Sequence, residues 1–356
     1  MINNLPRKLK EDIVAGYNYF IHSNKVPEHW KKFTVVPILK PSKDGSEISH
    51  YRPIVLASII RKTLEKILAL RLTFFLEKNK LWPQTQFGFR PGYSTINNLS
   101  ILLTDISNGF LQKQITETLF LDIHQAYDHV SISYLTGSLE KLRIPAQLIL
   151  FLRKLLMNRT LHLKNEQDNN REAYTGLPRG SSLSTVLYVM YTAELEKTSN
   201  SRILQFADDV VVYDRTERRK IQETDFQRNI TRTVEWLKER NLDINTQKST
   251  YIIFSTSNNI TNFNKTIKVF NKHLFPQQTT KFLGLHLQYN LKWNIHREML
   301  VNYINKTHAI FKYLAGRWWG TTIKELRILF FGLIQAKLEY RNFLMKPQPT
   351  TNHQDR

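Results

Sequence analysis

Two short stretches decide the fold: TLFLDI at residues 118–123 and ILQFADDVVVY at residues 203–213. The first is an apolar run that ends in Asp122, a pattern typical of a buried strand with a carboxylate at its carboxyl end. The second reads as two apolar strands joined by a turn at Ala-Asp-Asp, residues 207–209. The sequence therefore predicts a core sheet that carries several acids at one edge.

Helical patterns surround these strands. Residues 131–143 and 146–157 read as helices, and a helix at 225–241 and a strand at 249–255 follow the hairpin. This order predicts an α+β fold, namely a split βαβ sheet with helices on one face. Such a sheet would place the strand that ends in Asp122 beside the hairpin.

The flanking regions are also patterned. The apolar run at residues 33–36 is followed by a Pro/Lys/Gly loop at 37–45, and residues 55–78 read as one amphipathic helix. Two further helices, at about 295–315 and 321–340, are expected near the end of the chain.

Composition excludes several classes of protein. The chain has 356 residues, 41% of them apolar, and no cysteine, which excludes a disulfide scaffold, a Cys-ligated zinc site and a thiol nucleophile. It lacks an apolar run of 18 residues and an N-terminal secretory pattern, so we expect an intracellular protein with no membrane span and no clear targeting signal.

The charge is strongly basic: 51 Lys and Arg against 30 Asp and Glu give a net charge of +21. Residues 1–80 hold 15 basic and 7 acidic side chains, and residues 291–356 hold 11 and 4. Two basic ends around a more balanced centre favour a nucleic-acid partner, although solvated lysines alone would give the same counts.

The three acids predict a metal site. An Asp-Asp pair by itself is more often a solvated turn, but Asp208 and Asp209 have strongly apolar flanks. Carboxylates held close together repel one another unless a cation lies between them, and hard oxygen donors suit Mg²⁺. Two such ions would serve in-line phosphoryl transfer.

Seven blocks in a fixed order carry a resemblance. The chain resembles the reverse transcriptase domain of non-LTR (LINE-type) retrotransposons, most of all the jockey-type elements of insects. The blocks are VVPILKPSKDGSEISHYRPIVLAS (35–58), QFGFRPGYST (86–95), FLDIHQAYDHV (120–130), GLPRGSSLS (176–184), FADD (206–209), INTQKSTYIIFS (244–255) and KFLGLHL (281–287).

The resemblance implies a right-hand polymerase fold of fingers, palm and thumb around the split βαβ palm sheet. On this basis we expect fingers at 1–95, a palm with embedded fingers helices at 96–255, a primer-grip region at 256–290 and a basic helical thumb at 291–356. KFLGLHL could equally be a plain β-hairpin between palm and thumb.

It also implies the metal ligands. Asp122 and Asp208 would ligate both of two Mg²⁺ ions, for which Mn²⁺ could substitute. The backbone carbonyl of Ile123 would help, and Asp209 would be the third, less direct acid.

Further roles follow from the resemblance by position. Tyr127 would lie under the sugar of the incoming nucleotide and exclude a 2′-hydroxyl, Lys40 and Arg52 would contact its triphosphate, and Lys248 would donate a proton to the leaving pyrophosphate. Asp128 would be a supporting hydrogen-bond acceptor. The alternatives are a core aromatic for Tyr127 and solvated or strand-edge lysines for Lys40 and Lys248.

The GLPRGS segment both matches the family and departs from it. Gly176, Pro178 and Gly180 would let the backbone approach the template–nucleotide pair. Arg179 stands where the family usually has Gln, and Thr185 where it usually has Pro.

The implied function is RNA-directed DNA synthesis by a mobile-element enzyme. Its partners would be an RNA template, a DNA primer and a dNTP, with the endonuclease domain supplied from elsewhere and a nuclear location. Two alternatives stay open: a group II intron-type or domesticated reverse transcriptase, and a catalytically inactive, truncated retroelement remnant that only binds nucleic acid.

Overall fold

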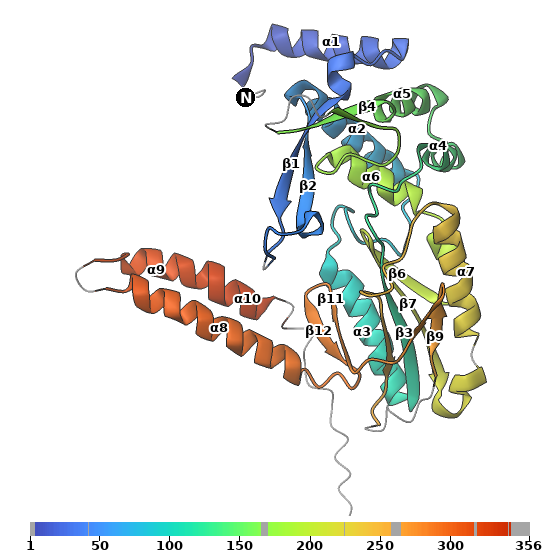
Figure 1. Cartoon of the computed structure of the whole chain (residues 1–356), viewed down its shortest axis with the longest axis vertical. Helices are drawn as coiled ribbons and strands as arrows, with labels where there is room; N and C mark the ends of the chain where they lie inside the picture. Colours follow the sequence, from blue (N-terminus) through green and yellow to red (C-terminus); the bar gives the residue numbers. More distant parts are fainter. Residues whose placement is uncertain are drawn as a thin grey trace, which may run out of the picture.

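The structure, a computed structural model, describes residues 4–41, 43–164, 170–223, 225–257, 265–316, 319–340 and 342. Its helices are α1 (Arg7–Ser23), α2 (Ile59–Lys78), α3 (Thr95–Leu111), α4 (Ile132–Lys141), α5 (Ala146–Leu156), α6 (Ser182–Tyr191), α7 (Phe226–Glu239), α8 (Asn294–Leu314), α9 (Ile323–Leu329) and α10 (Ala336–Glu339). Its strands are β1 (Lys32–Leu39), β2 (Tyr51–Leu56), β3 (Gln114–Asp122), β4 (Arg159–Leu163), β5 (Asn170–Ala173), β6 (Arg202–Phe206), β7 (Asp209–Glu217), β8 (Thr250–Phe254), β9 (Ile267–Val269), β10 (Lys272–Leu274), β11 (Thr279–Phe282) and β12 (Leu285–Gln288). They form a two-tiered body with a projecting helical arm (Figure 1).

The lower tier is built on a four-stranded antiparallel sheet of order β6-β7-β3-β8. β3 and β6 run parallel to each other with β7 between them, and the chain passes from β3 to β6 through α4, α5 and α6. This is the predicted split βαβ unit. The register places Asp122 opposite Asp209, which confirms that the two acidic stretches lie side by side.

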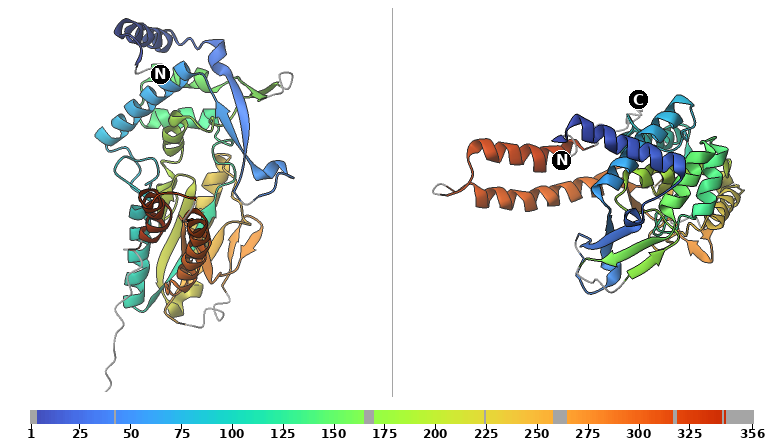
Figure 2. Two further views of the ribbon diagram at one scale, coloured as in Figure 1. Left: turned by 90° about the vertical axis from the view of Figure 1, so that its left-hand side faces the viewer. Right: turned by 90° about the horizontal axis from the view of Figure 1, so that it is seen from above.

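Both faces of this sheet are covered, so the expectation of helices on one face only is wrong. Leu119 and Leu121 of β3 belong to the core cluster that contains α6 and α7, whereas Phe120 between them belongs to the cluster that contains α3 and the β11–β12 hairpin. Figures 1 and 2 show α3 and α7 on opposite sides of the sheet. A strand buried on both faces has a continuous apolar run, as residues 118–121 do, because its side chains alternate between the faces.

The upper tier contains a second sheet, β2-β1-β4-β5, packed near α2. The loop predicted at 37–45 is wrong at its start, because β1 continues to Leu39. Pro37 of β1 lies opposite Pro53 of β2. Pro37 also lies beyond the part of β1 that pairs with β4, so neither proline removes an N–H from the hydrogen bonds between β1 and β4, the two central strands of this sheet. The helix predicted at 55–78 begins later, at Ile59, after β2.

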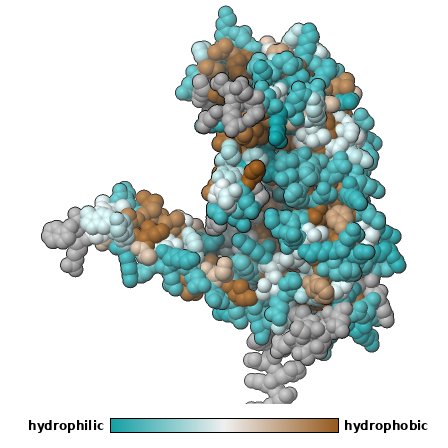
Figure 3. Space-filling model, in the orientation of Figure 1, coloured by the Kyte–Doolittle hydropathy of each residue, from teal (hydrophilic) through white to brown (hydrophobic). Residues whose placement is uncertain are grey.

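The arm consists of α8 running outward and α9, a π-helical turn and α10 running back (Figure 2). The arm matches the two helices predicted at 295–315 and 321–340. Parts of the last two predicted domains lie outside the described residues, namely 258–264, 317–318, 341 and 343–356. Apolar side chains gather on its surface (Figure 3), among them Ile310, Tyr313, Phe330 and Phe331. Within the described ranges we find no helix that is both long enough and apolar enough to cross a lipid bilayer.

Candidate active site

The acidic edge of the sheet is set by strand register. Asp122 is the last residue of β3, and Asp209, opposite it, is the first residue of β7. Only Ala207 and Asp208 form the turn between β6 and β7, so Asp209 lies in the strand and not in the turn as predicted. Three acidic residues thus lie where β3 ends and β7 begins.

This edge opens into a cavity of about 1350 Å³ that is also lined by the β1–β2 hairpin. Most of the predicted site residues line it, although they come from six places: the loop after β1, strand β2, the end of β3 and the segment after it, the segment before α6, the β6–β7 turn, and the loop before β8. They are Lys40, Arg52, Asp122, Ile123, Tyr127, Arg179, Gly180, Asp208 and Lys248.

Gly176, Pro178 and Asp209 do not line the cavity. Gly176 has φ +77°, and a Cβ there would lie 2.5 Å from the carbonyl oxygen of Asp128, so the glycine permits a close approach to this backbone and not to a ligand. Pro178 is buried, and its carbonyl accepts a hydrogen bond from the Ser184 hydroxyl at 2.9 Å. Both residues shape the segment behind the cavity wall.

Two of the acids, Asp122 and Asp209, have raised pKa values. Burial, followed by the charges of Asp208 and Asp122, raises the pKa of Asp209 to about 6. Burial also raises the pKa of Asp122, and Asp208 adds to this rise, whereas the Lys248 ammonium, 3.9 Å from an Asp122 oxygen, opposes it. A cation bound at this edge would offset the repulsion.

The donor set fits a divalent cation. Asp122 and Asp208 present hard carboxylate oxygens to the cavity. Among the described residues no three Asp, Glu or His side chains are already grouped as a metal site. This arrangement suits Mg²⁺, which is usually held by one or two carboxylates together with water and substrate phosphates.

Cationic side chains line the same cavity. Lys40 and Arg52 come from the β1–β2 hairpin, where the backbone N–H of Lys40 donates to the His50 carbonyl at 2.8 Å. Lys43 and Lys248 also line it. A cavity with both carboxylates and ammonium or guanidinium groups can hold a metal-bound polyphosphate.

Arg179 is held by Asp128. Its Nη2 donates to Asp128 Oδ2 at 2.7 Å and its Nε to Oδ1 at 3.2 Å, a two-point pairing. Its backbone carbonyl accepts from the N–H of Val55 at 3.2 Å, which joins the GLPRGS segment to β2. Asp128 is thus an acceptor, as expected, and its donor is the residue that departs from the family pattern.

Tyr127 forms part of the cavity wall on a buried support. Its ring stacks on Tyr188 with centroids 5.0 Å apart and planes at 27°. Burial, and secondarily Asp208, raises the pKa of Tyr127, so its hydroxyl stays neutral at any physiological pH. The stack fixes the ring in place.

Sequence reasoning gave no role to two buried polar residues near the site. Arg159 donates to the carbonyls of Thr175 and Gly176 beneath the GLPRGS segment. Gln86 is 1% exposed and bonds to the backbone of Ala207 in the acidic turn. The available signal was the position of Gln86 as the first residue of the QFGFRPGYST block, which does not by itself name a partner.

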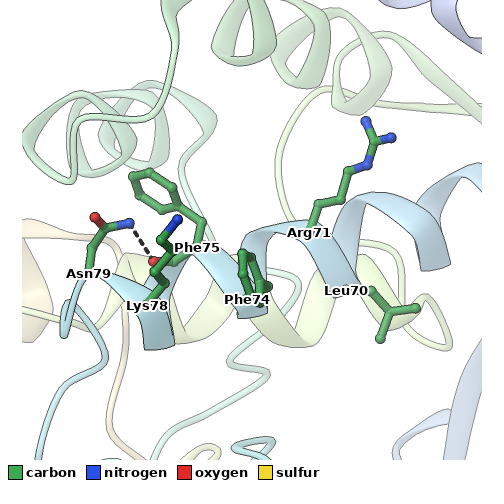
Figure 4. Close-up of a pocket in the computed structure, with 6 residues that line it drawn as sticks. All are labelled: Leu70, Arg71, Phe74, Phe75, Lys78 and Asn79. Atoms are coloured by element: carbon green, nitrogen blue, oxygen red, sulfur yellow. Dashed lines mark hydrogen bonds between the residues drawn. The ribbon is translucent and has the colours of Figure 1, made fainter.

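A second cavity, of about 640 Å³, lies on the outer side of α2 (Figure 4). Its lining includes Leu70, Phe74 and Arg71 but contains no acid and none of the predicted site residues. It therefore offers no metal-binding chemistry.

Comparison with known proteins agrees with this site. Residues 38–287 match the family of the reverse transcriptase (RNA-dependent DNA polymerase). A Drosophila melanogaster protein named "Probable RNA-directed DNA polymerase from transposon X-element" is 30% identical over 70% of this chain and 28% of its own length. The "RNA-directed DNA polymerase from mobile element jockey" of the same species is 24% identical over 83% of this chain and 33% of its own length.

The chain spans about a third of the length of these curated relatives. A solved structure of apo telomerase from Candida tropicalis superposes with a TM-score of 0.50 at 12% identity, over 80% of this chain and 53% of that one, which supports the right-hand polymerase fold. The matched family uses divalent metal ions and binds an RNA template and a primer. With the match spanning both acidic stretches and the cavity around them, this chain belongs to the reverse transcriptase (RNA-dependent DNA polymerase) family.

Proposed function

We propose that this chain catalyses RNA-templated DNA synthesis for a mobile element: the 3′-hydroxyl of a DNA primer attacks the α-phosphorus of a dNTP, and pyrophosphate leaves. The observation that carries the proposal is the cavity that Asp122 and Asp208 line together with Lys40, Arg52 and Lys248. Carboxylates supply metal ligands, and the cationic side chains supply contacts for phosphates.

We assign two Mg²⁺ ions, replaceable by Mn²⁺, to Asp122 and Asp208, with Asp209 and the backbone carbonyl of Ile123 in support. When bound, such ions activate the attacking hydroxyl and offset charge on the leaving group. The protein contributes Asp122 at the end of β3 and Asp208 in the turn that leads into the neighbouring strand β7, whose register with β3 is fixed, so little has to move when the site fills.

Lys40 and Arg52 are the proposed ligands of the triphosphate, since both line the cavity from the β1–β2 hairpin. Lys248 is the proposed general acid for pyrophosphate. Its Nζ lies 3.9 Å from an Asp122 oxygen, beside the proposed metal ligands.

Tyr127 is the proposed sugar selector. Stacking on Tyr188 fixes its ring, and a fixed ring under the sugar would leave no room for a 2′-hydroxyl. Arg179 and Gly180, which line the cavity, are proposed to lie beside the templating base pair, with Gly176 and Pro178 shaping the segment behind them.

We further propose fingers at 1–95, a palm at 96–255, a primer-grip region at 256–290 and a thumb at 291–356. The palm assignment rests on the β6-β7-β3-β8 sheet, and the thumb assignment on the basic arm. The natural partners would be an element RNA, a DNA primer and an endonuclease domain encoded elsewhere, acting in the nucleus.

Primer extension tests the proposal. Purified chain would be given poly(rA), an oligo(dT) primer and dTTP with Mg²⁺ or Mn²⁺, beside Asp208→Asn and a matched Asp225→Asn, since Asp225 is exposed and outside the cavity. We expect extension by wild type and Asp225→Asn, and a loss of at least a hundredfold in kcat for Asp208→Asn.

Two other outcomes would contradict the proposal. Equal activity of Asp208→Asn and wild type would contradict the metal assignment. If the folded wild-type chain binds the hybrid but extends no primer with either metal, the chain is the nucleic-acid-binding remnant.

A further inference from the structure

The turn that carries Asp208 has an unusual backbone. Ala207 has φ +58°, in the left-handed region that residues with a side chain rarely adopt, and it directly precedes Asp208. Such a conformation persists only where the surroundings fix it, and it is often found at functional sites.

One side-chain amide bonds to both backbone polar groups of Ala207. Gln86 Oε1 accepts from the N–H of Ala207 at 2.9 Å, and Gln86 Nε2 donates to the Ala207 carbonyl at 3.3 Å. The same Oε1 accepts from the N–H of Gly88 at 2.8 Å. Gln86 is 1% exposed, so water does not compete for these bonds.

Gln86 is itself held firmly beside the hairpin. The N–H of Phe87 donates to the Gln205 carbonyl at 3.0 Å, and the N–H of Gln205 donates to the Thr85 carbonyl at 2.8 Å. Residues 85–87 thus extend the sheet next to β6. Asn98 of α3 donates to the same Gln205 carbonyl at 3.1 Å, which ties the segment to a helix as well.

Gly88 leaves space for this contact. A Cβ at this position would lie 2.3 Å from the Ala207 nitrogen and 3.0 Å from Gln86 Oε1. Both neighbours are parts of the amide clamp, so position 88 has no room for a side chain. Gln86, Gly88 and the hairpin turn therefore fit as one unit.

We infer that Gln86 is a positioning residue for the reaction: it clamps the Ala207 backbone and so sets the direction in which Asp208 and Asp209 present their carboxylates toward Asp122. Gln86 does not line the cavity. The inference rests on the proposed function, but it concerns the geometry of the carboxylates and can be read out by metal binding alone.

The test replaces the amide with an apolar chain of similar length, Gln86→Met. Thr85→Ala is the matched control, because it removes side-chain bonds to Glu196 and Gln205 from the same segment without touching Ala207. Measurements are the melting temperature, kcat and KM for dTTP in primer extension, and Mn²⁺ affinity by titration calorimetry in the absence of nucleic acid.

For Gln86→Met at a temperature where it is folded, we expect kcat to fall at least tenfold and Mn²⁺ affinity about tenfold, with KM for dTTP within threefold of wild type. Thr85→Ala should keep wild-type kcat and Mn²⁺ affinity even if its melting temperature falls. A folded Gln86→Met with wild-type kcat and metal affinity would overturn the inference.

If Gln86→Met does not fold, Gln86→Asn, which keeps the amide but is one methylene shorter, is measured in the same way, and the same losses are expected. If wild type extends no primer, the proposed function fails, and Mn²⁺ affinity of the two variants still decides whether Gln86 positions the carboxylates.

Discussion

At the scale of single residues, Asp209 makes the stability of the metal-free chain depend on pH. Its pKa is raised to about 6 in the folded chain by burial and by Asp208 and Asp122, against 3.8 for an ordinary Asp. Between these two values the folded state binds more protons than the unfolded state, so this group's contribution to stability falls as pH rises from about 4 through 6.

We therefore expect a pH-dependent effect of metal on thermal stability. At pH 7.5, Mg²⁺ should raise the melting temperature, because it offsets the repulsion among ionised carboxylates. At pH 4.5 it should have little effect, since protons already neutralise part of the site. Melting curves with and without Mg²⁺ across this range provide the check, and an equal rise at both pH values, or an undiminished rise in Asp208→Asn, would contradict the assignment.

Arg179 gives a second residue-scale prediction. Its pairing with Asp128 is partly exposed, so Arg179→Gln should change the free energy of unfolding by less than about 1 kcal/mol. The lost cation should raise KM for dTTP by roughly three- to tenfold, because Arg179 lines the cavity proposed for the triphosphate, and kcat should stay within about threefold.

Arg179→Lys is the control, since it keeps the charge and loses the two-point geometry. Its KM should lie closer to wild type than that of Arg179→Gln. Steady-state kinetics distinguishes the two cases. A large increase in kcat for Arg179→Gln would contradict the prediction and would mean that an arginine at this position, where the family usually has Gln, slows the enzyme.

At the scale of elements, one buried ion pair anchors α2. Arg61, fully buried, donates to Glu65 at 2.7 Å and to the Trp30 and Leu155 carbonyls, so it joins α2 to the segments before β1 and at the end of α5. Arg61→Met should destabilise the chain by about 3–5 kcal/mol, because Glu65 is left buried without its partner. Urea unfolding measures this.

Two variants make the prediction specific. The double variant Arg61→Met/Glu65→Leu should lose less stability than Arg61→Met, since no unpaired charge remains. Arg71→Met on the same helix should stay within about 0.5 kcal/mol of wild type, because Arg71 is exposed at the outer cavity (Figure 4). Equal losses at positions 61 and 71 would show that the pair has no special role.

Elements with strong local patterns could be predicted, and elements set by pairing could not. β3 and the β6–β7 hairpin are apolar runs flanked by acids, and the structure confirms them. β4 and β5, RTLHL and NREA, were not predicted, because their polar residues match an exposed loop as well as a half-exposed strand. The last two residues of β2, Val55 and Leu56, fall within the helix predicted at 55–78, although Ser58, which caps α2, marks the boundary.

The candidate site likewise contains residues that the sequence predicts and residues that it does not. Residues that carry charge or a ring into the cavity could be named from the motifs, as Asp122, Asp208 and Tyr127 were. Gln86 could not, because its role depends on the hairpin 121 residues away in the sequence and on the hydrogen bonds that the fold creates. Contacts of this kind are tertiary and leave little local pattern.

At the scale of the whole molecule, the arm is a basic projection. Lys306, Lys312, Lys324, Arg327 and Lys337 are all exposed on it. Its surface also carries exposed rings, including Tyr313, whose ring contacts that of Trp319 at 4.9 Å between centroids. Exposed cations on a helical arm suit contact with the phosphates of a duplex, which needs no base-specific contact.

The salt dependence of hybrid binding tests this role for the arm. Lys306→Gln/Lys312→Gln on α8 should weaken binding of an RNA–DNA hybrid and reduce the slope of log K against log salt by about 2, because each phosphate contact contributes about 0.9 to that slope. Lys8→Gln/Lys25→Gln, exposed residues on and just after α1, removes the same charge from the other end of the body and should leave the slope nearly unchanged. Fluorescence anisotropy between 50 and 200 mM salt distinguishes the two, and equal changes in both double variants would mean that net charge, and not the arm, governs binding.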